Sequence, residues 1–599
     1  MKRILLSITF YIFTPLLWAT PLQNDVDLLL KRVDPAINIG ALVVDLNTGE
    51  TLYSRNASNA FIPASNMKLF SDAAALLALG PNYRFQTELS TNAHHLDKGV
   101  LDGSIYLYLP GDPSFTSKDL KQLLSELKTW GITRIKGNIV LISSRHGISP
   151  YAPGWTKKDL VYSYGAPLAP LILDENRLVV TVNPAARVGQ HAVIELRPSN
   201  NGLKLNNEVI TKAKAKNCGL SYLMDAKNQL TVRGCIGAGQ WSAQQGLAIK
   251  NPTIYAKAQI RSELSALGIR LDGKILYGRK PAHALLLAKH QSRTLSQLLT
   301  QTLKTSNNLY ADSLYLHTAA VLNGAPVSWA GAQSILKKFL QAETGINFNK
   351  ANFTDGSGLS RQDKLTPKQT VELLQFLYAR FPLAYEYIAA LPVAGRDGTL
   401  RKRLKKPSQK GFVRAKTGTM RGIVSLSGYL YTANAHTLAF ALYINKGPKT
   451  KPQTTWRYPA LIDTLCSFFL KQHPSEPDAT KNNNAHARVA FQHQASQAQI
   501  TQNHAKKWRH IELALKRALK GKPVAVVYRG DYLILDDQSK DSKIVWRALQ
   551  QVNKKYAFSA ALHAASAPIK NPIKPSLLWV KTNKSATESR TWTLRDSAG

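Results

Sequence analysis

Apolar and polar residues change their spacing several times along the chain. Near the N-terminus, residues 38–45 and 51–53 are apolar segments of strand length around a turn, which predicts a β-hairpin. Residues 67–79 are rich in Ala and Leu and are followed by Gly80 and Pro81, as expected of a buried helix and its end. The pattern therefore predicts two strands followed by a core helix.

Residues 88–283 have a different pattern, in which short apolar segments alternate with turns. Five of these segments are strand-like: residues 105–109, 139–142, 178–182, 192–196 and 230–232. We therefore expect one or two β-rich domains at this position, inserted into the rest of the fold.

Helical spacing returns near residue 295, with helices expected at 308–320 and 329–341 and two strands at 423–430 and 437–444. Residues 20–87 and 284–474 are thus expected to form one domain that the insertion interrupts. The predicted fold class is α/β, of the mixed α+β kind.

The composition changes again after residue 474. Residues 475–505 are rich in Asn, Gln, His, Ala and Ser and predict a polar linker. Residues 506–599 predict a small basic α/β extension, with a helix at 506–520, a hairpin at 524–528 and 532–535, and a second helix at 544–552.

The first nineteen residues are typical of a Sec-type signal peptide. Lys2 and Arg3 precede the apolar run 4–17, and Ala19 is a small residue at the expected cleavage point. The alternative is an uncleaved membrane anchor, but the run is shorter than the roughly 20 residues of a typical span. We expect an exported protein of the periplasm.

Positive charge is in large excess, with 78 Lys and Arg against 37 Asp and Glu and a formal net charge of +41. For an exported chain the matching partners are anionic envelope surfaces, and an export signal argues against nucleic acid. Residues 475–599 hold 21 Lys and Arg against 9 Asp and Glu. This extension is a candidate contact to an anionic envelope surface or a cell-wall partner; the alternative is an extension without a specific ligand.

Three cysteines in an exported chain indicate one disulfide and one spare thiol. Cys218 and Cys235 are close in sequence and flank a strand-like segment, so we expect them to pair. Cys466 lies in an apolar run and is expected to be a buried thiol.

Three short motifs occur in a fixed order, S-x-x-K, S-x-N and K-T-G, at residues 65–68, 306–308 and 416–418. Single motifs are weak signals, because Ser125 to Lys128 is also S-x-x-K and Ser199 to Asn201 is also S-x-N. The order and the local context carry the argument: a Pro-Ala entry and a buried helix at the first motif, a helix after the second, and two strands after the third.

The motifs supply the parts of a serine acyl-transferase that needs no histidine. A serine hydroxyl becomes nucleophilic when a neighbouring base takes its proton, and a lysine serves when burial and a second cation lower its pKa. The expected catalytic residues are Ser65 as nucleophile, Lys68 as general base, Ser306 as proton relay and Asn308 as the group that holds Lys68.

The third motif is expected to bind the substrate. Its strand can pair with an extended peptide, and its side chains suit a terminal carboxylate. The expected substrate-binding residues are Lys416, Thr417, Gly418 and Thr419, and the backbone N–H groups of Ser65 and Thr419 are expected to hold the oxyanion. Asp355 and Asp397 lie in Gly-rich turns and are interpreted as turn formers. No metal-ligand spacing is found and no cofactor is expected.

With these motifs in place, the chain resembles the class C low-molecular-mass penicillin-binding proteins, which are D-alanyl-D-alanine carboxypeptidase/endopeptidases. The resemblance covers roughly residues 25–470. It includes the segments 63–68, 111–114, 174–176, 306–312, 355–361, 395–400, 416–419 and 427–429.

The resemblance implies a transpeptidase-like domain, a five-stranded antiparallel sheet between helices, with the insertion between the first two motifs. It also implies acylation of Ser65 by peptidoglycan peptides that end in D-Ala-D-Ala, hydrolysis of the acyl-enzyme, and acylation by β-lactams. One departure is the segment 154–159, which is more basic than the acidic, Trp-rich stretch of the family.

Two alternatives remain from the sequence. A β-lactamase-like hydrolase would need fast deacylation by a positioned base and water, and the long insertion argues against it. A cell-wall binding or scaffold protein with a vestigial site is opposed by the intact motifs.

Overall fold

The computed structural model describes residues 21–33, 36–143, 145, 147–169, 171–199, 202–214, 218–447 and 457–471, together with five strands between 524 and 596. The expected signal peptide at 1–19, the linker at 475–505 and the helices at 506–520 and 544–552 lie outside the described residues. One compact unit reaches His473 and a second begins at Pro474.

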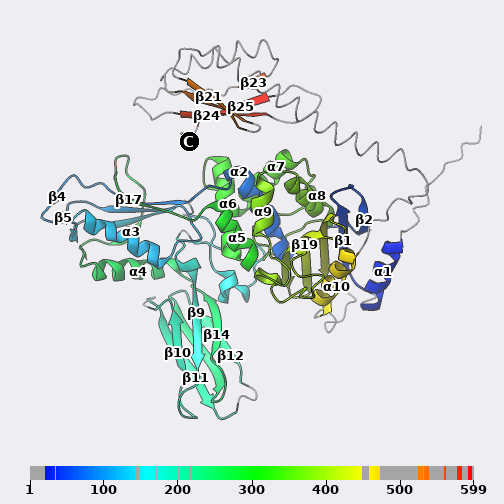
Figure 1. The fold of residues 1–599 in the computed structure, drawn as a ribbon. Helices are drawn as coiled ribbons and strands as arrows, with labels where there is room; N and C mark the ends of the chain where they lie inside the picture. The colour runs from blue at the N-terminus through cyan, green and yellow to red at the C-terminus, as the bar shows by residue number, and fades with distance from the viewer. Residues whose placement is uncertain are drawn as a thin grey trace, which may run out of the picture. The chain divides into compact units, whose positions relative to one another are not determined.

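A five-stranded antiparallel sheet is the centre of the first unit (Figure 1). Its order is β18-β19-β20-β1-β2, so β1 from the start of the first unit pairs with β20 from near the end of that unit. The strands are β1 (Ile39–Asp45), β2 (Thr51–Arg55), β18 (Val413–Met420), β19 (Ile423–Tyr431) and β20 (Thr437–Asn445). The expected hairpin and the two expected strands near 423–444 are confirmed.

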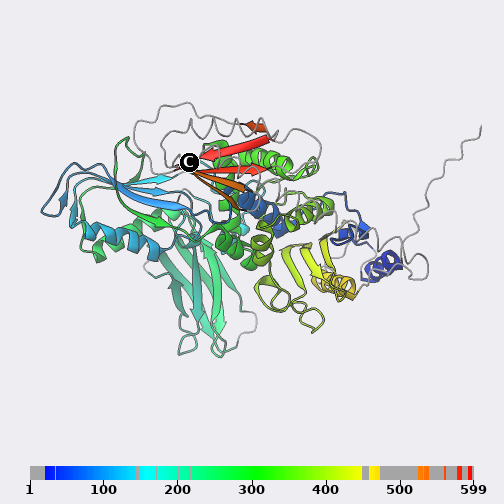
Figure 2. The ribbon, with the colours of Figure 1, turned by 45° about the horizontal axis from the view of Figure 1, so that its top comes forward.

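Helices cover both faces of this sheet, because its central strands are buried on both sides. On one face, Tyr429, Ala439 and Tyr443 belong to a core shared with six helices: α2 (Lys68–Leu79), α5 (Leu295–Thr305), α6 (Asn308–Asn323), α7 (Trp329–Thr344), α8 (Pro367–Tyr378) and α9 (Leu383–Ala390). The opposite face packs on α1 (Pro21–Val33) and α10 (Tyr458–Lys471). The predicted five-stranded sheet between helices is therefore confirmed (Figures 1 and 2).

The insertion contains two modules. The first is a mixed sheet, β16-β8-β6-β3-β17, with a short four-stranded sheet, β15-β7-β5-β4, beside it. The strands of these two sheets are β3 (Gln86–Thr91), β4 (Leu96–Asp97), β5 (Val100–Leu101), β6 (Ile105–Leu109), β7 (Arg134–Ile135), β8 (Ile139–Ser143), β15 (Arg270–Leu271), β16 (Ile275–Tyr277) and β17 (Leu285–Gln291). Because β3 pairs with β17, the module extends a few residues beyond the expected 88–283 at both ends.

Two helices of the first module were not expected, α3 (Ser117–Thr129) and α4 (Pro252–Ala266). The signal for α3 was present: Thr116 and Asp119 form a capping box, and four leucines at helical spacing are buried. The neighbouring strand-like segments outweighed this signal in the interpretation of the insertion as mostly β.

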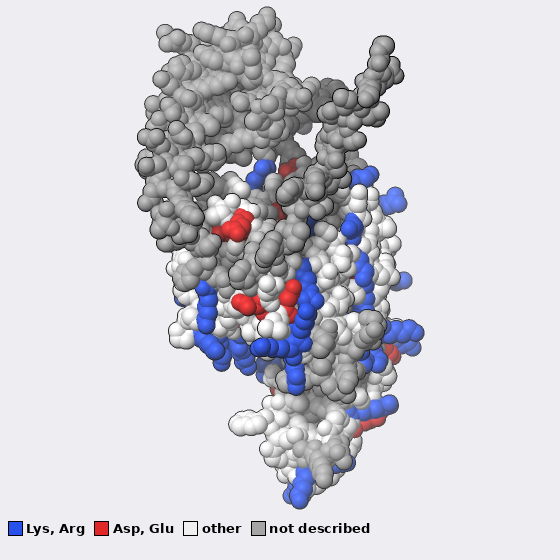
Figure 3. Space-filling view, turned by 90° about the vertical axis from the view of Figure 1, so that its right-hand side faces the viewer, with Lys and Arg blue, Asp and Glu red and all other residues white. Residues whose placement is uncertain are grey.

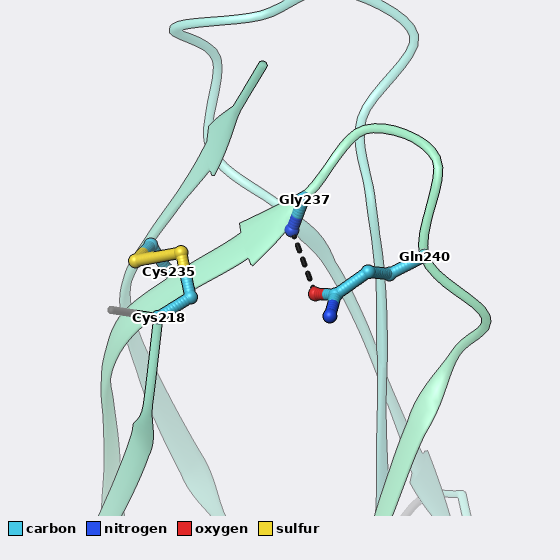
Figure 4. The surroundings of a disulfide bond; sticks show 4 residues. All are labelled: Cys218, Cys235, Gly237 and Gln240. Carbon is cyan, nitrogen blue, oxygen red and sulfur yellow. Dashed lines mark hydrogen bonds between the residues drawn. A yellow bond between two sulfur atoms is a disulfide. The ribbon is translucent and has the colours of Figure 1, made fainter. Parts of the chain in front are cut away.

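The second module consists of two three-stranded sheets, β10-β9-β14 and β11-β13-β12. Its strands are β9 (Arg177–Asn183), β10 (Val193–Arg197), β11 (Lys204–Lys212), β12 (Leu220–Met224), β13 (Gln229–Gly237) and β14 (Ala243–Ala248). The predicted disulfide is confirmed: Cys218 lies just before β12 and bonds to Cys235 on β13 (Figure 4). Cys466 is a free, fully buried thiol on α10, also as predicted.

The second unit is described through one sheet, β21-β22-β24-β25-β23. Its strands are β21 (Val524–Arg529), β22 (Tyr532–Asp537), β23 (Ser559–Ala561), β24 (Ser576–Thr582) and β25 (Thr591–Asp596). β21 and β22 are antiparallel neighbours, which confirms the expected hairpin.

Lys and Arg side chains are spread over the described surface of the face in Figure 3, with few Asp and Glu among them. Among the described helices, none has both the length and the apolar character that a membrane span requires.

Candidate active site

The first motif forms a tight turn at the entrance of a buried helix. Residues Ala64–Met67 are a 3₁₀ turn, and α2 begins at Lys68, one residue later than expected. Ser65 is half-buried, whereas Lys68 is fully buried. Lys68 Nζ lies 3.0 Å from Ser65 Oγ, so the lysine reaches the serine across the turn.

Two further groups hold the Lys68 amine. Lys68 Nζ donates to Asn308 Oδ1 and to the Ser357 carbonyl, each at 2.7 Å. The Asn308 contact agrees with the role expected from sequence. The Ser357 contact was missed, because a backbone acceptor 289 residues away leaves no side-chain signal in the sequence.

The second motif lies where two helices meet. α5 ends at Thr305, and the backbone of the next residue, Ser306, is left-handed (φ 59°). The Asn307 side chain caps α6 by accepting from the Tyr310 N–H. Asn308 is the first residue of α6. This reversal turns Ser306 toward the third motif, and Lys416 Nζ donates to Ser306 Oγ at 2.8 Å.

The third motif lies on β18, the edge strand of the sheet. Lys416 is fully buried and its Nζ also donates to the Thr417 carbonyl at 2.7 Å. Thr417 Oγ1 donates to Thr399 Oγ1 at 2.8 Å, whereas Thr419 is exposed. A Cβ at Gly418 would lie 2.1 Å from Ser425 Oγ and 2.9 Å from the Pro63 carbonyl, so only glycine allows the Ser65 turn to approach this strand.

The Gly-rich loop that follows Phe353 packs against the Ser65 turn and supports the site. Asp355 is buried and accepts the backbone N–H groups of Ser357, Gly358 and Ser360. The interpretation of Asp355 as a turn former is confirmed. Gly358 (φ 77°) packs so closely on the Ala64 carbonyl that a Cβ would lie 1.8 Å from it. Asp397 is a turn former as well, because it accepts the Val393 N–H.

Burial dominates the electrostatics of the two lysines. Desolvation lowers the pKa of Lys68 to about 8, against the opposing attraction of four buried carboxyl groups, Asp312, Asp355, Asp72 and Asp363. Burial also lowers the pKa of Lys416 well below its usual range, and the neighbouring Lys68 lowers it further. Lys68 is thus an amine that changes its charge close to neutral pH.

The insertion braces the second motif and the Gly-rich loop. Asn308 Nδ2 donates to the Tyr164 carbonyl at 2.8 Å, and Asn307 Nδ2 donates to Glu175 Oε2 at 2.7 Å. Trp155 Nε1 donates to Asp355 Oδ2 at 2.8 Å. Trp155 and Glu175 lie in the segments 154–159 and 174–176, but their residue types predicted no part in the site.

The residues around Glu175 have an unusual backbone. Asp174, Glu175 and Asn176 all have positive φ angles of 49–57°, a conformation that costs free energy for residues other than glycine. Three contacts hold the turn: Tyr255 Oη and the Ser117 N–H donate to Asp174, and Asn176 Nδ2 donates to the Pro167 carbonyl. The turn is thereby fixed where Glu175 meets Asn307.

The structure brings all eight predicted site residues into one place. Together they define a class of site: a serine with a buried lysine partner, a second serine–lysine pair and an open strand edge. Within the described part of the chain, no group of three or more His, Cys, Asp or Glu is arranged to hold a metal ion. The chemistry available is acyl transfer to Ser65.

The comparison with known families agrees with this class. The model of the D-Ala-D-Ala carboxypeptidase 3 (S13) family matches residues 22–460, and the chain belongs to that family. The D-alanyl-D-alanine carboxypeptidase DacB of Haemophilus influenzae is 31% identical over 422 residues, which are 70% of this chain and 87% of the relative. A D-alanyl-D-alanine carboxypeptidase of an Actinomadura species is 32% identical over 450 residues, 72% of this chain and 81% of that protein.

A solved structure is similar as well. The crystal structure of penicillin binding protein 4 (dacB) from Haemophilus influenzae matches with a TM-score of 0.67 and 30% identity, covering 75% of this chain and all of that one. The same protein complexed with a novel β-lactam matches with a TM-score of 0.63. The family resemblance and the transpeptidase-like fold predicted from sequence are confirmed.

The contact of Glu175 with Asn307 predicts a measurable effect on acylation by a labelled penicillin. Glu175→Ala removes an acceptor for Asn307, so the second motif loses one of its supports. The acylation rate should fall by about tenfold or more, since a hydrogen bond to a charged group is worth roughly 1.5–3 kcal/mol. Glu175→Gln keeps an acceptor oxygen and should retain most of the rate.

Arg177→Ala is the matched control, because it removes the exposed ion pair with Glu175 but leaves Asn307 bound. Its rate should equal that of the unmodified protein. Equal rates for Glu175→Ala and Arg177→Ala would show that the Asn307 contact does not support the second motif.

Proposed function

We propose that this protein is a serine-type D-Ala-D-Ala carboxypeptidase with D,D-endopeptidase activity, acting through an acyl-enzyme on Ser65. The observation that carries the proposal is the buried Lys68 amine, 3.0 Å from Ser65 Oγ and held by Asn308. A buried amine with a lowered pKa is a base for a serine hydroxyl near neutral pH.

In the proposed acylation, neutral Lys68 takes the Ser65 proton as Oγ attacks the carbonyl of the penultimate D-Ala. The backbone N–H groups of Ser65 and Thr419 hold the oxyanion. Ser306, which accepts a hydrogen bond from Lys416 Nζ, is proposed to pass its proton to the leaving amine and to regain one from the Lys68 ammonium, and the C–N bond breaks. Water then hydrolyses the ester, and Ser65 is restored.

The substrate is proposed to add to the outer edge of β18 as an extended peptide. Its terminal carboxylate would be bound by Lys416, Thr417 and Thr419, with Gly418 allowing close approach. A peptide ending in D-Ala-D-Ala fits these groups, as does the cross-link of two peptidoglycan stems. In β-lactams a carboxylate and a reactive amide are arranged much as the terminal carboxylate and the scissile amide are in the peptide. β-Lactams are therefore proposed to acylate the same serine. A relative of known structure has been solved with a β-lactam.

The assignment of Ser65 predicts the outcome of labelling with fluorescent penicillin. Ser65→Ala should abolish the labelled band, because no other group in the site forms the ester, and intact-mass spectrometry should show one adduct on the unmodified protein only. Ser125→Ala changes another S-x-x-K serine, which lies on α3, and should label normally. Labelling of Ser65→Ala would disprove the assignment, and rapid turnover without an adduct would favour the β-lactamase alternative.

The role of Lys68 as a base predicts a rise of the acylation rate with pH. Lys68 accepts a proton only when neutral, and burial lowers its pKa to about 8. The rate should therefore be low below that pH, increase through it and level off above, whereas an unperturbed lysine would give a midpoint near 10.4. Stopped-flow acylation across pH 5–11 measures the midpoint; one near 10 would contradict the role.

Export to the periplasm is proposed from the signal-peptide pattern of residues 1–19.

An anionic envelope surface or cell-wall component is proposed as the partner of residues 506–599. The excess of Lys and Arg in that extension supports this proposal. The full chain without residues 1–19 should co-sediment with purified sacculi more strongly than the same chain ended at residue 474, and added salt should reduce the difference. Equal sedimentation of the two chains would exclude the extension as a wall-binding part.

A further inference from the structure

The second module of the insertion ends in three neighbouring segments, residues 184–193, 211–219 and 237–242. They cover the connections from β9 to β10, from β11 to β12 and from β13 to β14. Backbone hydrogen bonds join them, because the Gly189 N–H donates to the Thr211 carbonyl and the Ala238 N–H donates to the Lys212 carbonyl. These three segments are called the module tip below.

The tip lies at the far end of the module from the catalytic motifs. β9 begins at Arg177, which pairs with the Glu175 side chain that holds Asn307, and its seven residues run toward the tip. At a rise of roughly 3.3 Å per residue, this strand separates the tip from Glu175 by about 20 Å. The strands of the module form a lobe of their own in Figure 1. The tip is therefore not part of the site described above.

Three apolar side chains of the tip are exposed to solvent: Val188 at 57%, Val193 at 53% and Trp241 at 95%. Val193 pairs with Asn183 at the end of β9, and Trp241 lies two residues before the point where β14 pairs with the other side of β9. The valine and the indole thus flank the same strand end. An indole exposes a large apolar area, so apolar side chains gathered at one end of a domain indicate an interaction surface.

The turn that precedes Trp241 is braced. The Gly237 N–H donates to Gln240 Oε1 at 2.9 Å, and the Gln240 N–H donates to the Gly237 carbonyl at 2.9 Å. Figure 4 shows this turn at the end of β13, beside the disulfide that ties β13 to the segment before β12. Because the turn is already fixed, a partner would need to order little of the chain when it binds the indole.

The charge of the tip is positive only. Its three segments contain no Asp or Glu, and their basic residues are Arg187, Lys212, Lys214 and Lys216. The first three are exposed and form no ion pair among the described residues. The strands of the module contain two acids, and both are already paired with arginines, Glu195 with Arg197 and Glu208 with Arg233. The positive charge of the tip is thus available to an anionic partner.

We propose that the module tip docks on an anionic lipid bilayer, with the Trp241 indole among the headgroups and the exposed basic side chains against the lipid charges. Tryptophan favours the membrane–water interface, where its ring leaves water and its N–H stays hydrated. Lys and Arg beside it are attracted to anionic headgroups. A glycan is a poorer match, because the tip has two valines beside its indole and no carboxylate to accept sugar hydroxyls. The inference is independent of the chemistry proposed for Ser65.

Quenching by brominated lipids tests whether Trp241 enters a bilayer. The chain without residues 1–19 is mixed with vesicles of brominated phosphatidylcholine and phosphatidylglycerol, which quench tryptophans that lie within the lipid. The unmodified protein should lose more fluorescence than Trp241→Ser does. Trp130→Ser changes the other exposed tryptophan of the described residues, on the first module, and should leave the lipid-dependent quenching unchanged.

Flotation with the same lipids measures the part played by charge. Replacing Lys212 and Lys214 together by Gln should lower the partition coefficient about twenty-fivefold, at about fivefold for each charge removed. Lys227→Gln with Lys250→Gln is the matched control. These exposed lysines precede Asn228 and Asn251, whose hydrogen bond lies at the opposite end of the module. That control should float like the unmodified protein, and equal unfolding temperatures would show that all variants are folded.

Three results would overturn the inference. Equal quenching of the unmodified protein and Trp241→Ser would show that the indole stays outside the bilayer, whatever the extension after residue 474 contributes to vesicle binding. Equal flotation with phosphatidylcholine alone and with the anionic mixture would show that lipid charge is not recognised. If Trp241→Ser weakened sedimentation with sacculi but not flotation with vesicles, the tip would be a cell-wall contact and not a lipid contact.

Discussion

Burial of the Lys68 amine is the interaction on which the site depends. An ammonium group loses hydration inside the protein, so the neutral amine gains in relative stability and the pKa decreases to about 8. Full burial requires neighbours that replace water, and three segments supply them: the Ser65 turn, Asn308 at the start of α6 and the Ser357 carbonyl. The close approach of these segments at Gly358 and Gly418 leaves no space for a Cβ.

The insertion is part of this arrangement and not only an appendage. Through Tyr164, Glu175 and Trp155 it contacts both the second motif and the Gly-rich loop. Its turn at 174–176 has three consecutive left-handed residues, a conformation that persists only where surrounding contacts hold it. The same turn therefore joins the core of the insertion to the Ser306 reversal.

The buried acidic residues near the site differ in the hydrogen bonds that they accept. Asp312, Asp355 and Asp363 accept backbone N–H groups and so combine loop structure with charge compensation. Asp72 is fully buried and accepts no hydrogen bond among the described residues.

The sequence by itself determined the three motifs, the hairpin, the disulfide between Cys218 and Cys235 and the antiparallel sheet implied by the family resemblance. These features depend on local spacing, on turn residues and on a recognisable order of short strings. The eight site residues could be named for the same reason, because side-chain chemistry is written in the residue types.

Only the tertiary structure decided how those residues meet. The Ser357 carbonyl that holds Lys68, the Glu175 carboxylate that holds Asn307 and the isolation of Asp72 are contacts across long sequence separations or consequences of burial. Backbone acceptors and solvent exclusion leave no periodic signal in a sequence. The pKa of Lys68, which burial sets, therefore emerges only when the segments are packed together.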